Sequence, residues 1–414
     1  NEPDHYQLVS QGMLYDNKAE INDKSLISHL YDRPLSLSSQ AIESYNSCRF
    51  KYFADRGLRP RLRQEYKIDY KDIGGIYHKT MEMVTDNVIN NEGFLFENEC
   101  VISQEIKEIA RQAVNEIETQ NDILNDNSRN QYIKDKIQKT AEISATYLIK
   151  QLQKSKFRPV LIEAGFGLEN ATLKPIQIEI GENEWAIVNG RIDRIDLYSS
   201  GDSNYVTVLD YKSSGRTVDL NEVLNGIGLQ LFIYLDAVLE HNQNTLTENL
   251  AFGGMFYFQV SDPLIDGDKV DEHDIQEEIF KKFSLQGYVI DDLDIIKSMD
   301  TDLMAGESSK ILDSIKLKQD EGLSSSSRTL GKSHLESIIA AIEDIVRDTA
   351  QGILSGRIDI NPYQYKGKKP CTYCDYLAIC QFDQALPSNQ YRRINPKSEK
   401  DIIDSLKKGD GKTN

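Results

Sequence analysis

Four cysteines constrain what this chain can fold into, because they stand near opposite ends of the sequence. Three of them form a C-x2-C-x5-C cluster made of Cys371, Cys374 and Cys380, and Cys48 stands alone near the start. Such close spacing is typical of metal ligands rather than of a disulfide framework. A metal centre held by all four thiolates would tie the two ends of the chain together. The fifth cysteine, Cys100, is expected to be a free thiol.

Four thiolates suit either a structural zinc ion or an iron–sulfur cluster, and the chemistry of the ligands leaves both open. Structural zinc more often uses two local pairs of cysteines than one remote cysteine and a trio. Closing a loop of roughly 320 residues removes about 5 kcal/mol of unfolded-state entropy. Because this is comparable to the net stability of a whole domain, we expect a structural role for the centre. The alternative is four unrelated buried thiols.

The bulk properties limit the class of protein. With 414 residues, the chain can form one elaborated domain or two. It begins with Asn1 rather than Met and contains no stretch typical of a signal peptide or a membrane span. We therefore expect a soluble cytoplasmic piece of a longer polypeptide, with no membrane partner.

The net charge of -18 argues against a generally basic surface for nucleic acid. Any contact with DNA must then be local. Two basic clusters can supply it, Arg49 to Arg63 and Lys366 to Lys369. The alternative interpretation is that both clusters are ordinary solvated faces.

The periodicity of apolar residues predicts helices before and after a central group of strands. Ser38 is a candidate N-cap for a helix whose buried stripe includes Cys48. A second helix is expected from about Ile76 to Ile89, after a pair of glycines, with His78 at the edge of its apolar face. Further helices are expected within 101–155 and over 220–239 and 333–356, and a mobile loop over 301–332.

The central segment has the composition of strands. They are expected over 160–168, 172–180, 185–198 and 205–212 as an antiparallel meander, with another over 250–260 after the helix at 220–239. Strands and helices in this order predict an α/β sandwich. Residues 1–35 are interpreted as a lead-in from a preceding domain and 386–414 as a polar tail.

The end of the strand at 205–212 carries the chemistry of a metal-dependent hydrolase. Because side chains alternate along a strand, Asp210 and Lys212 point to one side and Tyr211 to the other. Asp193, from the neighbouring Gly-Arg-Ile-Asp segment, can complete a carboxylate pair for a hard cation such as Mg²⁺. The metal would polarise a phosphate and lower the pKa of a water, and Lys212 would offset the charge that develops on phosphorus.

Each of these residues also has an ordinary structural explanation. An Asp-x-Lys pair at a strand end is commonly a surface salt bridge. Spacing alone leaves open whether Asp193 or Asp196 is the ligand, since the two project to opposite faces. His78 can be a core or surface histidine, and Glu163 can be a simple strand carboxylate.

Taken together, the motifs resemble a known family. The order Gly75-x-x-His78, Gly190-x-Ile192-Asp193, Asp210-Tyr211-Lys212 and Gln230-x-x-x-Tyr234 is similar to the RecB-type branch of the PD-(D/E)XK nucleases. The flanking cysteines narrow the resemblance to members that carry an iron–sulfur cluster. It covers residues 36–385, and one departure is Arg49, where the family often has Pro after its first cysteine.

The resemblance implies both a fold and residue roles. The fold would be a PD-(D/E)XK core, with a central mixed sheet flanked by helices, helical insertions and an iron–sulfur staple. It implies that Lys212 is catalytic and that Gln230 and Tyr234 position the DNA backbone. The implied metal ligands are His78, Asp193 and Asp210 for Mg²⁺ or Mn²⁺, with Glu163 and the Tyr211 carbonyl as further candidates, and Cys48, Cys371, Cys374 and Cys380 for a 4Fe-4S cluster.

The resemblance also implies an activity: metal-dependent exonuclease cleavage of DNA during the processing of double-strand breaks for recombinational repair. The implied partners are DNA and a helicase–nuclease subunit with which the protein forms a heterodimer in the bacterial cytoplasm. No Walker-type phosphate-binding motif is present, so the chain is not expected to hydrolyse ATP by itself. The alternatives are a nucleic-acid-binding scaffold with a silent nuclease site and a stand-alone four-cysteine exonuclease.

Overall fold

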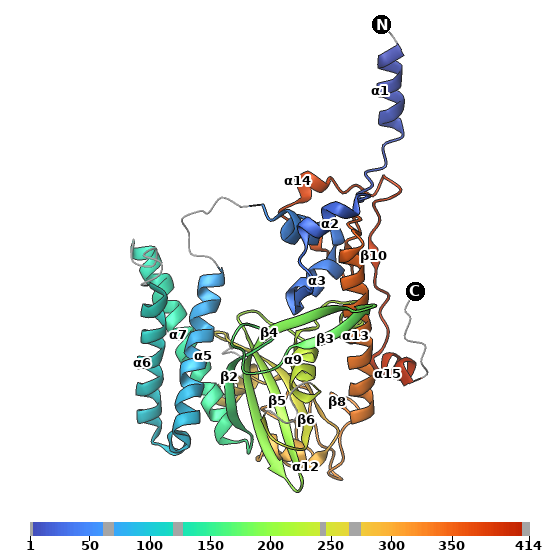
Figure 1. Ribbon diagram of the computed structural model, residues 1–414. Coiled ribbons are helices and arrows are strands. Elements are labelled where there is room, and N and C mark those ends of the chain that lie inside the picture. The colour runs from blue at the N-terminus through green and yellow to red at the C-terminus, as the bar shows by residue number, and fades with distance from the viewer. Residues whose placement is uncertain (1–2, 61–69, 119–126, 241–245, 265–274, 408–414) are drawn as a thin grey trace.

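The computed structural model describes residues 3–60, 70–118, 127–240, 246–264 and 275–407 (Figure 1). In this described part of the chain, an eight-stranded mixed sheet lies between helices, with the strand order β1-β4-β5-β6-β7-β8 and with β2 and β3 also paired to β4. The strands are β1 Leu35–Ser38, β2 Arg158–Phe166, β3 Ile176–Gly181, β4 Glu184–Ser200, β5 Ser203–Lys212, β6 Leu250–Gln259, β7 Gln286–Ile290 and β8 Thr329–Leu330.

The long strand β4 organises the sheet. Its first half pairs antiparallel with β3 and parallel with β1, and its second half pairs antiparallel with β2 and β5. The predicted meander is therefore wrong in its pairing, because β2 and β3 both pair with β4 and not with each other. A strand of 17 residues is long enough to hold two partners end to end along one edge. β6 runs parallel to β5, as expected when a helix connects two strands.

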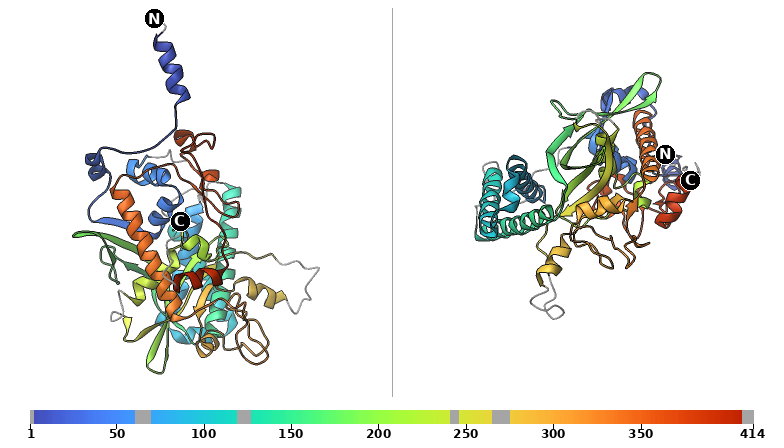
Figure 2. Two further views of the ribbon diagram at one scale, coloured as in Figure 1. Left: turned by 90° about the vertical axis from the view of Figure 1, so that its right-hand side faces the viewer. Right: turned by 90° about the horizontal axis from the view of Figure 1, so that it is seen from below.

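The two faces of the sheet belong to two different hydrophobic clusters. Val206 and Val208 pack with α3, α9 and α13, whereas Leu209 and Tyr211 pack with α5, α6 and α7. The predicted alternation along β5 is thus confirmed. The helices concerned are α3 Ser39–Ser47, α9 Gln230–Leu239, α13 Lys332–Leu354, α5 Tyr70–Asn90, α6 Glu99–Glu118 and α7 Ser128–Gln153 (Figure 2).

The segment around Cys48 is not one continuous helix. Ser38 caps α3 as predicted, by accepting a hydrogen bond from the Ala41 amide. The helix then stops at Cys48, which has an extended backbone with a φ of -165°. The chain continues as α4 Arg49–Tyr52 and a π-helix, Phe53–Leu58. Cys48 is nevertheless buried, as its place on the apolar stripe predicted.

The other predicted helix bounds need two corrections. The pair Gly74-Gly75 lies inside α5 rather than before it, because the packed apolar face of a long helix outweighs the low helix propensity of glycine. The helix predicted over 220–239 is two helices, α8 Leu220–Val223 and α9, separated by Gly226 and Gly228. Both glycines have a positive φ, of 80° and 73°, which a continuing α-helix does not allow.

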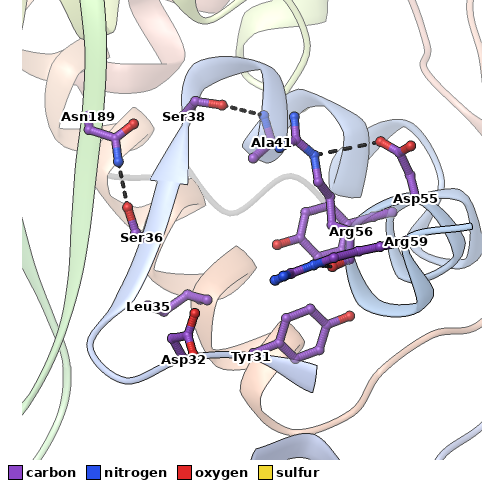
Figure 3. Close-up of a pocket in the computed structure, with 11 residues that line it drawn as sticks. Tyr31, Asp32, Leu35, Ser36, Ser38, Ala41, Asp55, Arg56, Arg59 and Asn189 are labelled. Atoms are coloured by element: carbon purple, nitrogen blue, oxygen red, sulfur yellow. Dashed lines mark hydrogen bonds and ion pairs between the residues drawn. The ribbon is translucent and has the colours of Figure 1, made fainter. Parts of the chain in front are cut away.

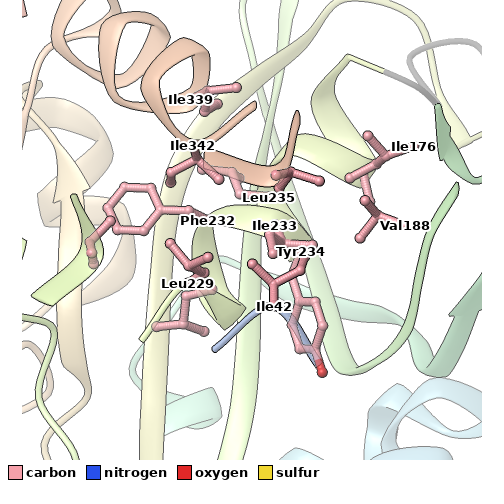
Figure 4. Close-up of a cluster of buried hydrophobic side chains, with 14 of the residues drawn as sticks. Ile42, Ile176, Val188, Leu229, Phe232, Ile233, Tyr234, Leu235, Ile339 and Ile342 are labelled. Atoms are coloured by element: carbon pink, nitrogen blue, oxygen red, sulfur yellow. The ribbon is translucent and has the colours of Figure 1, made fainter. Parts of the chain in front are cut away.

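α9 is buried along its whole length and lies between the sheet and α13 (Figure 4). Its apolar residues are all members of one cluster with Ile42 of α3 and with Ile339 and Ile342 of α13. Burying each such side chain contributes about 1.5–3 kcal/mol. This packing holds the first turn of α9 against the ends of β4 and β5.

One acidic residue in α9 has no charge partner in this core. Asp236 is 5% exposed, and one of its carboxylate oxygens accepts no hydrogen bond from the described residues. Burial, with Glu343 and Glu240 nearby, raises the pKa of Asp236 to about 7. Since this lies above the ordinary 3.8, the folded protein keeps a proton that the unfolded chain loses at lower pH.

We therefore expect the stability contribution of Asp236 to be fully present below about pH 4 and to be lost as the pH rises through about 7. Asp236→Asn is expected to raise the free energy of unfolding at pH 8 by about 2–4 kcal/mol and to change it little in acid. Chemical denaturation at both pH values measures this difference. Asp344→Asn, an exposed acid on α13, is the control. An unchanged pH dependence in the Asp236 variant would contradict the argument.

The ends of the described chain lie on the same side of the molecule. α1 Pro3–Met13 projects away from the core, and α2 Lys24–Leu30 packs on it through Ile27 (Figure 1). The segment interpreted as a polar tail returns to the fold, where Ile394 and Ile402 are buried. The remaining elements are a 3-10 helix at Glu92–Phe96, α11 Ile275–Lys282, α12 Leu293–Met299, β9 Tyr363–Gln364, a 3-10 helix at Pro370–Tyr373, α14 Leu377–Cys380, β10 Arg392–Arg393 and α15 Glu399–Lys407.

Candidate active site

The pairing of β4 with β5 brings the two predicted acids together. Arg194 pairs with Leu209 and Ile195 with Val208, so the next position along each strand places Asp193 opposite Asp210. Both are buried, with exposed fractions of 7% and 1%. Two carboxylates so close in a site with little water repel each other unless a cation or protons compensate them.

Lys212 lies beside Asp210, as the alternation along β5 predicted. Its Nζ is 2.5 Å from Asp210 Oδ2, and the lysine side chain is 20% exposed. The contact is an ion pair without the alignment of a hydrogen bond, so Oδ2 is a buried oxygen that accepts no hydrogen bond among the described residues. That oxygen is available to a further cationic partner.

α5 and β2 add His78 and Glu163 to the same centre. His78 Nδ1 lies 3.3 Å from Asp193 Oδ2. One ligand atom each from His78, Glu163 and Asp193 lie within 4.8 Å of one another. Glu163 has a left-handed backbone with a φ of 46°, which is uncommon for this residue type and often found at functional sites. A nitrogen and carboxylate oxygens in this arrangement can hold a divalent cation.

Gln230 and Tyr234 approach the centre from the first turn of α9. Gln230 Nε2 donates to Asp210 Oδ1 and contacts the Tyr234 hydroxyl, both at 2.7 Å. The two residues therefore orient one acid of the centre. Their predicted contact with the DNA backbone stays a prediction.

The backbone of β5 also orients the centre. The Tyr211 amide donates to Asp193 Oδ2 at 2.7 Å. The predicted role of the Tyr211 carbonyl as a metal ligand stays a prediction. On the opposite face, the Tyr211 hydroxyl contacts Thr85 at 3.4 Å and Arg194 at 3.5 Å.

The choice between Asp193 and Asp196 follows from these contacts. Asp196 is buried on the Tyr211 face and forms two 2.8 Å hydrogen bonds with Arg194. Asp193 is the member of the pair that lies with Asp210 and His78. A buried bidentate pair already satisfies Asp196, so this acid is not a candidate ligand in the observed arrangement.

Burial and mutual repulsion dominate the electrostatics of the centre. Burial, followed by the charge of Asp193, raises the pKa of Asp210 to about 7, and Lys212 opposes this shift. Burial and Asp193 also raise the pKa of Glu163. Burial disfavours the charged form of His78, but the hydrogen bond to Asp193 and the nearby acids outweigh it and raise its pKa. The centre therefore binds protons readily, and a divalent cation would displace them.

Arg191 also lies at this centre, although the sequence analysis assigned it no role. Its Nη1 is 3.5 Å from Glu163 Oε2, and its side chain is 59% exposed. It stands between Gly190 and Ile192 in the motif segment, so its position beside Asp193 was visible in the sequence. An exposed guanidinium next to an acidic centre can contact a phosphate from solvent.

The four predicted cysteine ligands come together from the two ends of the chain. Cys48, Cys371, Cys374 and Cys380 line one small cavity together with apolar side chains. Among the described residues, no three cysteine sulfurs lie within 4.8 Å of one another. Burial raises the pKa of Cys48 to about 11 and also raises the pKa of Cys371 and Cys380. Cys100 is exposed.

The two predicted basic clusters differ in their surroundings. Arg56 and Arg59 line a cavity of about 610 Å³ beside β1 and Asn189 of β4 (Figure 3). Lys366 and Lys368 instead pair with Asp219 and Glu222, at 3.0 and 2.9 Å. Arg61 and Arg63 lie outside the described residues.

Comparison with known proteins agrees with this geometry. A model of the PD-(D/E)XK nuclease superfamily matches residues 36–381. The chain therefore belongs to the PD-(D/E)XK nuclease superfamily, and the α/β fold predicted for it, a central mixed sheet flanked by helices, is confirmed.

The chain is also similar to curated proteins named as the AddB subunit of an ATP-dependent helicase/deoxyribonuclease. It is 34% identical to that of Oceanobacillus iheyensis over 398 residues, 95% of this chain and 34% of the relative. It is 31% identical over 408 residues to that of Alkaliphilus metalliredigens, 98% of this chain and 35% of the relative. For Bacillus subtilis the identity is 30% over 399 residues, 96% of this chain and 34% of the relative. The chain thus spans about a third of the length of these relatives.

The described helices were also compared with the length and hydropathy that a bilayer crossing requires. None of them meets both requirements.

Proposed function

We propose that this chain is the nuclease domain of an AddB-type subunit and hydrolyses DNA phosphodiester bonds as an exonuclease. The observation that carries the proposal is the convergence of Asp193, Asp210 and Lys212, with the ion pair of 2.5 Å and a buried oxygen that lacks a hydrogen bond. Superfamily membership supports the same reaction.

The residues present fit a divalent cation such as Mg²⁺ or Mn²⁺. In the proposal, Asp193, Asp210 and His78 hold it, with Glu163 as a further ligand. The cation supplies Lewis-acid polarisation of the phosphate and a more acidic attacking water. Lys212 places a fixed positive charge where negative charge develops on the phosphate oxygens. Gln230 holds Asp210 in position through its 2.7 Å hydrogen bond.

The buried position of this centre favours catalysis. Oxygen ligands inside the sheet edge keep the reacting phosphate away from bulk water, which strengthens every charge interaction there. Arg191 and Lys212 are the partly exposed cations through which the DNA strand would approach.

In the proposal, the partner is an AddA-type helicase–nuclease subunit, and the pair processes double-strand breaks for recombinational repair in the bacterial cytoplasm. The names of the similar proteins, which join helicase and deoxyribonuclease, support this assignment. A partner that delivers DNA also accounts for a net charge of -18 on a nuclease.

The four cysteines are proposed to hold a 4Fe-4S cluster. Four thiolates around one cavity fit this donor set. A tetrahedral zinc ion with Zn–S bonds of about 2.3 Å would bring the sulfurs to about 3.8 Å from one another. The wider spacing of the sulfurs favours a larger centre.

Removal of the divalent metal tests the proposed reaction. We expect the protein, purified without oxygen, to degrade linear DNA with Mg²⁺ and to lose at least about a thousandfold in rate with EDTA. Adding Mg²⁺ or Mn²⁺ in excess is expected to restore cleavage. Gel analysis of end-labelled DNA measures both the rate and the strand that is shortened. DNA binding with no cleavage under any of these conditions would favour the scaffold function instead.

A further inference from the structure

A second charged site lies away from the acidic centre. A cavity of about 410 Å³ opens between α3, α13 and the C-terminal strand β10, which lie near one another in Figure 1. Four arginines line it, and the one acid among the lining residues is the exposed Asp348. None of its lining residues belongs to the acidic centre. The four arginines are Arg49, Arg357, Arg392 and Arg393.

Most of this positive charge has no carboxylate partner among the residues that the structure describes. Arg49 is the exception, since its Nη1 lies 2.8 and 2.9 Å from the two oxygens of Asp359. Arg392 donates instead to neutral groups, the Asn46 carbonyl and Asn225 Oδ1, the latter at 3.3 Å. Arg357 and Arg393 are exposed and form no ion pair with the described acids.

The concentration of charge is unfavourable without a counter-ion. Burial, followed by repulsion from Arg49, lowers the pKa of Arg392. A partly buried guanidinium without an opposite charge is destabilising. In a protein with 66 acidic and 48 basic residues, compensating carboxylates are plentiful, yet three of these arginines have none in the described chain. The arrangement is that of a site prepared for an external anion.

We propose that this cavity binds a phosphate group. Guanidinium groups present planar pairs of N–H donors that match the oxygens of phosphate. The cavity volume lies in the range of small-ligand sites. The bound group is either a phosphodiester of a DNA strand or a free phosphate or nucleotide, since both offer the same oxygens.

The site joins parts of the chain that are distant in sequence. Arg49 directly follows Cys48, whereas Arg392 and Arg393 form β10. A phosphate held between them neutralises repulsion between the segment that carries Cys48 and the segment that follows the C-terminal cysteines. Its binding is therefore expected to stabilise the fold, independently of nuclease activity.

The test uses the double variant Arg357→Gln/Arg393→Gln in the intact protein. Both residues are exposed, and an unchanged melting temperature in chloride checks that the variant folds. Arg111→Gln, an arginine on α6 with 57% side-chain exposure, is the matched control. Inorganic phosphate is titrated against chloride at equal ionic strength with EDTA present, and melting temperature is recorded. Anisotropy of a labelled single-stranded oligodeoxythymidylate is measured in the same buffer.

We expect phosphate to raise the melting temperature of the wild type and of the control, and the double variant to bind it at least about tenfold more weakly. Weaker oligonucleotide binding by the double variant, with competition by phosphate, identifies the ligand as a DNA phosphodiester. Unchanged oligonucleotide binding with a lost response to phosphate identifies a free phosphate or nucleotide. The proposal is overturned if neither probe distinguishes the double variant from the control.

Discussion

Replacing Asp210 by Asn is expected to reduce DNA cleavage by at least about a thousandfold while leaving the protein folded. Asp210 is 1% exposed and contacts both Lys212 and Gln230, so its carboxylate holds the centre together. Asparagine has nearly the same shape but cannot supply a charged oxygen to a divalent cation. The rate of Mg²⁺-dependent release of nucleotides from linear DNA measures the effect.

The same substitution also separates catalysis from stability. Because burial and Asp193 raise the pKa of Asp210 to about 7, its charged form is unfavourable in the protein without metal. The melting temperature of Asp210→Asn without metal is therefore expected to equal or exceed that of the wild type at pH 8. Glu108→Gln, an exposed acid on α6, controls for the loss of one charge. Cleavage at the wild-type rate by the Asp210 variant would show that the centre lies elsewhere.

The local part of the candidate site could be predicted from the sequence. Alternation along a strand places Asp210 and Lys212 on one side, and the observed clusters follow that rule. Whether Asp193 or Asp196 joins them could not be predicted, because either acid fits the spacing. The decision depends on Arg194, which pairs with Asp196 on the other face.

The arrangement of distant segments was harder to predict. The elements from β2 to β6 were recognised by periodicity, but the joint pairing of β2 and β3 with β4 depends on the length and curvature of one strand. The arginine-lined cavity was missed for a similar reason. Arg49 stood in a predicted basic cluster, whereas Arg357, Arg392 and Arg393 are isolated from it in sequence and meet it only in the fold.

Replacing Cys374 by Ala is expected to remove iron from the protein and to destabilise it by about 5 kcal/mol. The thiols of Cys48 and Cys374 line one cavity, although they come from opposite ends of the chain. A centre that joins them closes a loop of roughly 320 residues, and its loss returns that entropy to the unfolded chain. Since this is close to the net stability of many domains, the variant is expected to be largely unfolded at 37 °C.

Cys100→Ala is the matched control, because Cys100 is exposed and lies outside the cavity. Iron and sulfide content, visible absorption and circular dichroism are measured for both variants after anaerobic purification. If Cys374→Ala retains the absorption and stability of the Cys100 variant, the cysteines do not form a structural centre. If it loses iron and keeps its stability, a centre is present but does not hold the two ends together. Only the joint loss of iron and of folding, confined to the four cavity cysteines, agrees with a metal centre that closes the fold around the active site.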